Sequence, residues 1–291
     1  METEAASIAV LSGKGGTGKT LVSVNLAASA KKAVYIDCDV EEPNGHLFFK
    51  PEGSDFEDVT VKVPKIVLSL CSGCRKCADF CKFNAIAFIG KQPMVFEDVC
   101  HPCGGCVYVC PEKAIKEEDR IIGEIQIGRS EDVAVYTGAL FAGEESGVPI
   151  IKKLLEFGGR DECPLRIIDC PPGSNCVVME SIRDADYCVL VAEPTIFGVH
   201  NLNMVYELVQ LFNKPFGVIL NKCIEGDNPS EKFCFDHGIP ILARIPFDAK
   251  LGRLNSNGTI ISRVSREYKE LFSSLLQKIT EEAQHAAAVN S

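Results

Sequence analysis

The segment 11–20, LSGKGGTGKT, fits two phosphate-binding patterns at once. Read as G-x-G-x-x-G from Gly13, it matches the fingerprint of a dinucleotide site. Read as G-x4-G-K-T ending at Thr20, it matches a P-loop for a nucleoside triphosphate. The first pattern predicts an NAD- or FAD-dependent oxidoreductase, and the second predicts an ATPase or GTPase.

The end of the loop favours the triphosphate. A helix that begins at Gly18 places Lys19 and Thr20 in its first turn, where the cation balances the charge of the β- and γ-phosphates and the hydroxyl binds Mg²⁺. The helix dipole and the backbone N–H groups of the loop complete an anion site. The predicted nucleotide-binding residues of the loop are Gly13, Lys14, Gly15, Gly16, Thr17, Gly18, Lys19 and Thr20.

Acidic residues downstream bear on the same choice. Asp37 and Asp39 lie near the position, about 20 residues after the loop, where a dinucleotide site needs an acid for the ribose. However, RIIDCPPGSN is an apolar strand that ends in Asp169 and is followed by a turn with Gly173. Such an acid holds Mg²⁺ through water, and such a turn can move toward a γ-phosphate. Hydride transfer uses neither group, so the sequence predicts a P-loop.

Eight of the fifteen cysteines form two runs, CSGCRKCADFC at 71–81 and CHPCGGCVYVC at 100–110. Both runs read C-x2-C-x2-C-x3-C, and each cysteine of the first recurs 29 residues later in the second. The dipeptide Ala85-Ile86 likewise recurs at 114–115, which indicates an internal duplication. Three thiolates on one tight loop can bind three irons of a cubane cluster, whose fourth iron needs a distant cysteine.

The array resembles the bacterial two-cluster ferredoxins over residues 61–123. In that family each cluster takes its distant ligand from the other run. The resemblance therefore implies two [4Fe-4S] clusters, one on Cys71, Cys74, Cys77 and Cys110 and the other on Cys100, Cys103, Cys106 and Cys81. The family's proline after the fourth cysteine is present at Pro111 and is replaced by Lys82 in the first run. A pair of zinc sites is the alternative, although zinc typically uses two cysteine pairs separated by a longer loop.

The other seven cysteines lie in or beside apolar runs, and we expect them to be small core side chains. Cys170 and Cys176 flank the PPGSN turn, where a response to redox state is a second hypothesis. The seven are Cys38, Cys163, Cys170, Cys176, Cys188, Cys223 and Cys234.

Short, mostly β-branched runs outside the cysteine array look like buried parallel strands. They lie at 7–12, 33–37, 133–137, 165–170, 187–192, 216–221 and 241–245. Helical patterns separate most of them, for example at 18–30 and 200–212, and a last helix is expected at about 265–284. This alternation predicts an α/β fold, a doubly wound, mainly parallel sheet of the P-loop NTPase type.

The cysteine array interrupts this α/β unit between its second and third predicted strands. We therefore expect a discontinuous P-loop ATPase domain at 1–60 and 124–291, with a small inserted ferredoxin-like α+β domain at 61–123. Such an insertion is tolerated where the two ends of a loop lie close together.

The composition limits the partners of the chain. A formal net charge of −10 over 291 residues disfavours a mainly electrostatic hold on nucleic acid or anionic lipid. No apolar run approaches the roughly 20 residues of a membrane span. The acidic start METEAAS does not look like a signal peptide, so we expect a cytoplasmic protein with reduced thiols.

The segment KGGTGKT, with Lys14 two residues into the glycine loop, resembles the deviant Walker A motif of the MinD/ParA/nitrogenase-iron-protein group. The segments YIDCDVEEPN and DCPPGSN look like the two switch regions of that group. This resemblance covers essentially the whole chain outside the insert. The complete chain is similar to MinD-superfamily P-loop ATPases that contain an inserted ferredoxin domain.

The resemblance implies roles for individual residues, among them the catalytic set Lys14, Lys19, Asp39 and Asp169. Lys14 would reach the phosphates of a partner across an ATP-sandwich homodimer, and Lys19 would contact the β- and γ-phosphates. Asp39 would position the attacking water.

The remaining implied roles concern the metal, the switch and the base. Thr20 would bind Mg²⁺ directly, and Asp169 would hold it through water. Gly173 would sense the γ-phosphate. Asn221 stands where the family reads adenine, and a strand cap is an alternative role for its amide. The C-terminus lacks the basic amphipathic tail with which MinD itself binds membranes, so no membrane anchor is expected.

The function most consistent with these features is a Mg-ATP-dependent ATPase whose nucleotide state is coupled to two [4Fe-4S] clusters. Our main hypothesis for this coupling is ATP-gated electron transfer to an unknown redox partner protein. One alternative is an iron–sulfur cluster carrier or assembly ATPase. Another is a MinD-like positioning ATPase with structural or redox-sensing clusters.

Overall fold

The computed structural model describes residues 6–160 and 163–290, in which one large sheet organises most of the chain. The sheet consists of β1 (Ala6–Leu11), β2 (Ala33–Asp37), β3 (Glu52–Ile66), β6 (Ile115–Ser130), β7 (Val133–Leu140), β8 (Leu165–Asp169), β9 (Tyr187–Ala192), β10 (Phe216–Cys223) and β11 (Ile241–Pro246). Its strand order is β11-β10-β9-β1-β8-β2-β7-β6-β3.

The strands from β11 to β7 are parallel, and each covers one of the predicted apolar runs. These runs are continuously apolar because helices cover both faces of the sheet, so neither face meets water. The predicted α/β fold with a doubly wound, mainly parallel sheet is confirmed.

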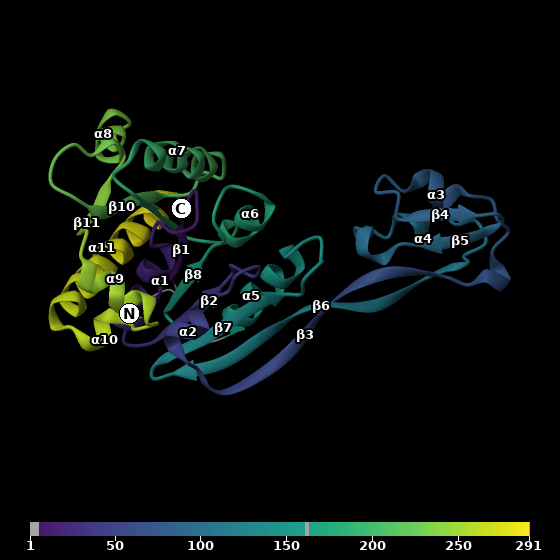
Figure 1. Ribbon diagram of the computed structural model, residues 1–291, viewed down its shortest axis with the longest axis horizontal. Helices are drawn as coiled ribbons and strands as arrows, with labels where there is room; N and C mark the ends of the chain where they lie inside the picture. The colour runs from purple at the N-terminus through teal and green to yellow at the C-terminus, as the bar shows by residue number, and fades with distance from the viewer. Residues whose placement is uncertain (1–5, 161–162, 291) are drawn as a thin grey trace.

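Two helical layers enclose the sheet (Figure 1). One core contains side chains of α1 (Lys19–Ser29), α2 (Gly45–Phe49), α9 (Ala249–Ser256), α10 (Ile261–Val264) and α11 (Arg266–Asn290). The other contains side chains of α5 (Val148–Arg160), α6 (Cys176–Ile182), α7 (Ile196–Leu211) and α8 (Pro229–Asp236). Helix α7 begins four residues before the expected start because Thr195 caps it, accepting a hydrogen bond from the N–H of Gly198. Among the described helices, none is both long and apolar enough to cross a membrane.

Two antiparallel strands extend the sheet beyond the predicted set. β6 pairs with β7 and β3 pairs with β6, from Glu52 opposite Arg129 to Ile66 opposite Ile115. Their far ends leave the body as a two-stranded ribbon that carries the insert (Figure 1). These strands escaped prediction because much of the ribbon is solvent-exposed and therefore rich in Glu, Asp, Lys and Arg. The boundaries expected at 60/61 and 123/124 fall inside β3 and β6, next to the register shift between Val59 and Thr60 in their pairing.

The insert contains 3-10 helices at 68–70 and 97–99, two short helices, α3 (Lys76–Phe80) and α4 (Gly105–Tyr108), and a hairpin of β4 (Ile86–Ile89) and β5 (Gln92–Val95). Its two halves repeat each other in detail. Left-handed residues recur at Arg75 and Gly104, and again at Asn84 and Lys113. Backbone hydrogen bonds from 67 to 114 and from 96 to 85, at 2.7 and 2.8 Å, exchange between the halves. The sequence duplication is therefore a structural one.

Because only the two-stranded ribbon carries the insert, we predict that the body folds without it. Replacing 67–114 by Asn-Gly joins Ile66 to Ile115, which already pair in register, through a two-residue hairpin turn. We expect the shortened protein to lose all bound iron while its thermal midpoint, followed by circular dichroism, stays within about 5 °C of the full chain. An insoluble or unfolded product would show instead that the body needs the insert to fold.

Candidate functional site

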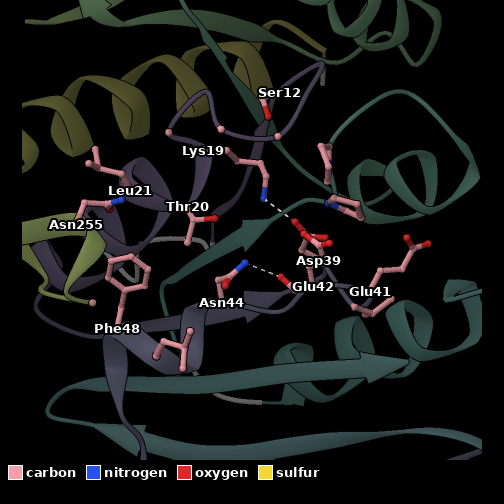
Figure 2. A pocket seen from close by; sticks show the side chains of 18 of the residues that line it. Ser12, Lys19, Thr20, Leu21, Asp39, Glu41, Glu42, Asn44, Phe48 and Asn255 are labelled. Carbon is pink, nitrogen blue, oxygen red and sulfur yellow. Dashed lines mark hydrogen bonds and ion pairs between the residues drawn. The ribbon is translucent and has the colours of Figure 1, made fainter. Parts of the chain in front are cut away.

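A cavity of about 820 Å³ lies at the carboxyl ends of β1, β2 and β8 (Figure 2). Its walls come from the glycine loop, from the segment 39–44 after β2, from the segment 171–177 after β8 and from the end of α9. The carboxyl edge of a parallel sheet is where loops from neighbouring strands meet, and the first turn of α1 adds a helix N-terminus. The cavity therefore has the location and wall expected for a phosphate ligand.

Two glycines of the loop are required by their surroundings. A Cβ at Gly13 would lie 2.1 Å from the carbonyl oxygen of Asn201, and a Cβ at Gly18 would lie 2.1 Å from Nδ2 of Asn221. Gly18 also has a φ of 96°, in the region that side chains disfavour. The close approach of α7 and β10 to the loop thus explains the glycines independently of any ligand.

Lys19 is the central cation of the cavity and is only 6% exposed. Its Nζ lies 2.7 Å from Oδ1 of Asp169 and 3.6 Å from Oδ2 of Asp39 (Figure 2 shows the second contact). Burial lowers the pKa of Lys19, but the surrounding carboxylates outweigh burial and raise it above its ordinary value. Lys19 is therefore charged and links the first turn of α1 to the ends of β2 and β8.

Tyr35 is a buried partner of Asp169 that the sequence analysis did not identify. Its hydroxyl donates a 2.8 Å hydrogen bond to Oδ2 of Asp169, the oxygen that Lys19 leaves free. Burial first, and then the charges of Asp169 and Asp37, raise the pKa of Tyr35. The residue stands within the apolar run of β2, so its sequence context indicates only a core side chain.

Asp37 anchors the segment that carries Asp39. Its carboxylate accepts hydrogen bonds from the backbone N–H groups of Asp39, Asn44 and Gly45, at 3.2, 3.1 and 2.8 Å. Burial and the charge of Asp169 raise the pKa of Asp37 to about 7, against the lowering effect of Lys19.

Asp39 lines the cavity itself, and burial raises its pKa to about 6 although Lys19 opposes the shift. Three carboxylates, of Asp37, Asp39 and Asp169, thus surround one lysine, and the site attracts further positive charge. Among the described residues of this cavity, no three His, Cys, Asp or Glu side chains are arranged to hold a single metal ion without further ligands. Mg²⁺ beside phosphates typically uses one or two protein carboxylates, and Thr20 also lines this cavity. The donor set therefore fits a magnesium–phosphate complex.

The structure places Lys14 away from the cavity wall. Its Nζ lies 3.0 Å from Oε2 of Glu193, whose other oxygen binds Lys222 at 2.6 Å. Lys222 in turn donates to the carbonyl of Gly16 at 2.6 Å. No motif in the sequence marks Glu193 or Lys222, since their proximity to the loop is produced by the fold.

Gly173 and Asn221 each donate a hydrogen bond to a backbone carbonyl of the segment 11–20. The N–H of Gly173 donates to the carbonyl of Ser12 at 2.9 Å, and Gly173 has a φ of 96°. Asn221 is 3% exposed and donates from Nδ2 to the carbonyl of Thr17 at 2.7 Å. Asn221 thus braces the loop in this conformation, and its adenine-reading role stays a prediction.

The insert holds two further cavities, each lined by four cysteines. One is lined by Cys71, Cys74, Cys77 and Cys110. The other is lined by Cys81, Cys100, Cys103 and Cys106. Each cavity thus draws three cysteines from one run and one from the other, as in the predicted ligand sets.

The environment of these thiols suits metal–sulfur bonding. Backbone N–H groups of Ala85 and Ala114 donate to Sγ of Cys81 and Cys110, both at 3.3 Å. Burial, together with the neighbouring thiols of Cys100 and Cys103, raises the pKa of Cys106 to about 11. Bound iron would stabilise the thiolates that burial and crowding disfavour.

The seven other cysteines are free in the structure. Cys176 is exposed and Cys223 is partly exposed, whereas Cys38, Cys163, Cys170, Cys188 and Cys234 are buried. Burial raises the pKa of Cys170 well above its ordinary value, which makes this thiol unreactive. The expectation of small core side chains therefore holds for the five buried ones.

The family model of the CobQ/CobB/MinD/ParA nucleotide-binding domain matches residues 8–277. An uncharacterized protein of Methanocaldococcus jannaschii is 31% identical over 279 residues, which are 94% of this chain and 97% of that protein. An iron–sulfur cluster carrier protein of the same organism is 24% identical over 296 residues, 94% of this chain and 84% of its own length.

Two further likenesses concern the insert type and the fold. The ferredoxin-type protein NapF of Haemophilus influenzae is 47% identical over 51 residues, 16% of this chain and 29% of NapF. The crystal structure of the cell division ATPase MinD from Pyrococcus furiosus superposes with a TM-score of 0.59 at 18% identity, covering 95% of this chain and 99% of MinD.

The raised pKa of Asp37 predicts a specific pH dependence of stability. The folded chain holds this proton up to about pH 7, whereas an unfolded chain releases it near its ordinary pKa of about 3.9. Asp37 therefore makes stability fall as pH rises between these values, by roughly 1 kcal/mol per pH unit. Asp37→Asn should remove this slope.

Urea denaturation followed by circular dichroism at pH 5, 6 and 7 measures this effect. As pH rises, the unfolding free energy of the wild type should fall relative to that of Asp37→Asn. Asp55→Asn, at an exposed position of β3, is the matched control and should run parallel to the wild type. Parallel curves for Asp37→Asn as well would mean that the buried carboxyl does not titrate in this range.

Proposed function

Because this chain belongs to the CobQ/CobB/MinD/ParA nucleotide-binding family, we propose that it is a Mg²⁺-dependent ATPase that holds two [4Fe-4S] clusters and acts in iron–sulfur cluster carriage. One observation carries the proposal. A cavity lined by Lys19, Thr20 and Asp39, with Asp169 ion-paired to Lys19, occurs in the same chain as two cavities lined by four cysteines each.

The residues of the nucleotide cavity divide the work of phosphoryl transfer to water. Lys19 neutralises charge on the β- and γ-phosphates, and the N–H groups of the loop orient them. Thr20 and Asp169 would hold Mg²⁺, which neutralises further phosphate charge. Asp39 orients the attacking water, and its raised pKa lets it accept a proton near neutral pH. Gly173 joins the second switch to β1 and carries the γ-phosphate signal.

Lys14 and the dimer belong to the same proposal. In this conformation Lys14 is held by Glu193, which is 14% exposed and also binds Lys222. An ATP-sandwich homodimer requires that Lys14 leave Glu193 for the phosphates of the partner, while Lys222 still neutralises Glu193. Measurements of molecular size with and without Mg-ATP distinguish a dimer that ATP induces from one that exists before ATP binds.

The clusters would use the cavity-lining cysteines. Cys71, Cys74, Cys77 and Cys110 would hold one cluster, and Cys81, Cys100, Cys103 and Cys106 the other. The N–H donors at Ala85 and Ala114 would bond to the sulfur of the distant ligands, which stabilises the charged thiolates. The proposal also includes recognition of the adenine base of ATP by Asn221.

Cluster carriage is supported by the carrier protein relative, which aligns with 94% of this chain. One observation favours a second candidate, ATP-gated electron transfer to a redox partner. Each cavity supplies four cysteines from within one chain, and clusters with a complete internal ligand set are suited to remain bound. A carrier must instead release its clusters to an acceptor protein.

Hydrolysis is tested with Lys19→Gln, which keeps an unbranched polar side chain one atom shorter and removes the charge. We expect ATP hydrolysis, measured as phosphate release, to fall at least about 100-fold, because a buried cation that stabilises transferred charge contributes on the order of 3 kcal/mol or more. Lys62→Gln, at an exposed site on the ribbon, should hydrolyse ATP like the wild type. Equal rates for Lys19→Gln and the wild type would contradict the proposed site.

The two candidate roles differ in the fate of the iron. Anaerobically purified protein labelled with ⁵⁷Fe is mixed with an apo-ferredoxin, with and without Mg-ATP, and the acceptor is separated and counted. Carriage predicts that label moves to the acceptor and that Mg-ATP changes the rate. Label that stays with the donor, together with rapid reduction of cluster-loaded ferredoxin by the reduced donor in a parallel assay, would reject carriage and support electron transfer.

A further inference from the structure

The ribbon that leaves the body in Figure 1 places the two thiol cavities at different distances from the body. We call the cavity of Cys81, Cys100, Cys103 and Cys106 the proximal cavity, and that of Cys71, Cys74, Cys77 and Cys110 the distal cavity. Lys62 and Pro64 of β3 line the proximal cavity, whereas Ile66, the last residue of β3, lines the distal one. At about 3.4 Å per residue, the distal cavity lies roughly 7–14 Å farther along the ribbon.

A contact with the body agrees with this order. Nε2 of His101, which lines the proximal cavity, lies 3.8 Å from Oε2 of Glu145. Glu145 belongs to the segment between β7 and α5 of the body. The distal cavity is therefore the outer of the two and the better placed to meet another protein.

The duplication allows the two halves of the insert to be compared position by position. Residues 67–89 contain three Lys or Arg and one Asp, whereas the equivalent residues 96–118 contain two Lys and five Asp or Glu. The whole chain carries −10, so the first half is basic against the general trend. Its Arg75 and Lys76 follow Cys74 directly and correspond to Gly104 and Gly105 in the second half.

Arg75 has a backbone conformation that favours glycine. Its φ is 64°, and the φ of the equivalent Gly104 is 69°. A side chain is disfavoured in this left-handed region, so the backbone alone would favour glycine at position 75 as well. The guanidinium of Arg75 lies over the ring of Phe88, 5.2 Å from its centroid, and both residues line the distal cavity. The reason for the arginine must therefore come from its side chain.

The cations at the distal cavity are available to a partner. Arg75 and Lys76 are exposed, and neither forms an ion pair within residues 6–160 and 163–290. Both line the distal cavity together with one acid, Glu112. The charges of the distal lining thus leave an excess of one cation.

The proximal lining is balanced by comparison. Lys62 is paired with Asp119 of β6 at 2.8 Å. Lys82 is accompanied by Glu117 in the same lining. The excess of unpaired positive charge therefore belongs to the distal cavity.

Apolar side chains and a thiol are exposed beside the same cations. The 3-10 helix 68–70 comes directly before Cys71, and its Leu68 and Leu70 are 55% and 52% exposed. The residue equivalent to Leu68 in the second half is Glu97. Cys74, which lines the distal cavity, is exposed as well.

We propose that the surface formed by Leu68, Leu70, Cys74, Arg75 and Lys76 docks an acidic partner protein, so that the partner meets the distal cluster. Unpaired cations attract an acidic surface and fix its orientation, and the exposed leucines lose contact with water once it is bound. The net charge of −10 repels the same partner from the rest of the chain. The inference rests on the proposed function, because the distal cavity has to hold a cluster, and it applies to both candidate roles.

The experiment measures anaerobic binding of a fluorescently labelled acidic ferredoxin to the full-length protein, at low and at high salt. Wild-type binding should weaken as salt rises, because salt screens exposed charges. Arg75→Gly combined with Lys76→Gln removes both charges and gives position 75 the glycine of the other half. We expect this variant to raise the dissociation constant at low salt at least about 10-fold. Leu70→Gln should weaken binding at both salt concentrations.

Two control variants match these changes. Lys31→Gln combined with Lys32→Gln removes the same charge from an exposed bend of the body. Leu211→Gln replaces an exposed leucine of α7. Both controls should bind the ferredoxin like the wild type. Iron content and phosphate release from ATP are measured on every sample, so that a loss of clusters or of folding is recognised.

The outcomes separate the inference from the function beneath it. A wild type that holds iron and hydrolyses ATP but binds no acidic ferredoxin, or binds a basic cytochrome c as tightly, would overturn the inference and leave the proposed function standing. Equal binding by the Arg75 and Lys76 variant would do the same. So would self-association through this surface, seen as a concentration-dependent size that the variant loses. A wild-type protein without iron would overturn both.

Discussion

Lys19 is buried among the carboxylates that end β2 and β8, and this arrangement governs the nucleotide site. Its ion pairs with Asp169 and Asp39 join three segments that are distant in sequence. Three acids so close together repel one another, and burial removes the water that would stabilise their charges. A cation between them offsets both effects. A phosphate that takes the charge of Lys19 must therefore come with another cation for the acids. Mg²⁺ accompanying a nucleoside triphosphate meets this requirement.

The same arrangement explains why ligand binding has to move the surrounding segments. Asp37 ties the chain after β2 to the sheet through three backbone N–H groups, and its pKa of about 7 shows how strongly burial opposes its charge. Charge added or removed at the cavity changes the balance at Asp37 and Asp39 together. Val40, which follows Asp39, accepts a hydrogen bond from the N–H of Leu140 and so joins this segment to the end of β7.

The ribbon sets the relation between the two parts of the protein. Because β3 and β6 belong to the body sheet at one end and to the insert at the other, the insert is an extension of the sheet edge (Figure 1). Ion pairs at Glu144 and Glu145 add contacts near the junction. The thiol cavity lined by His101, the partner of Glu145, is thereby distinguished from the other, although the two halves of the insert repeat one another.

Sequence patterns predicted the parallel strands well because a strand buried on both faces must be apolar throughout. They failed for β3 and β6, whose polar composition reflects a ribbon surrounded by water. At the site, the spacing of the loop predicted Lys19 and Thr20, and the strand ending in Asp169 predicted an acid beside them. Tyr35, Glu193 and Lys222 were missed, because a core tyrosine and single charged residues carry no distinctive local pattern.

By itself the sequence determined the chemistry available to this protein: a phosphate-binding loop, acids at strand ends and two four-cysteine runs of equal spacing. These are local features, set by residue type and by distances along the chain. Only the tertiary structure decided which charges face one another, because Lys14 meets Glu193 through strand crossovers that bring remote segments together, and Arg120 meets Glu144 across the hairpin of β6 and β7. It likewise decided that one thiol cavity, through His101 in its lining, contacts Glu145 of the nucleotide-binding body.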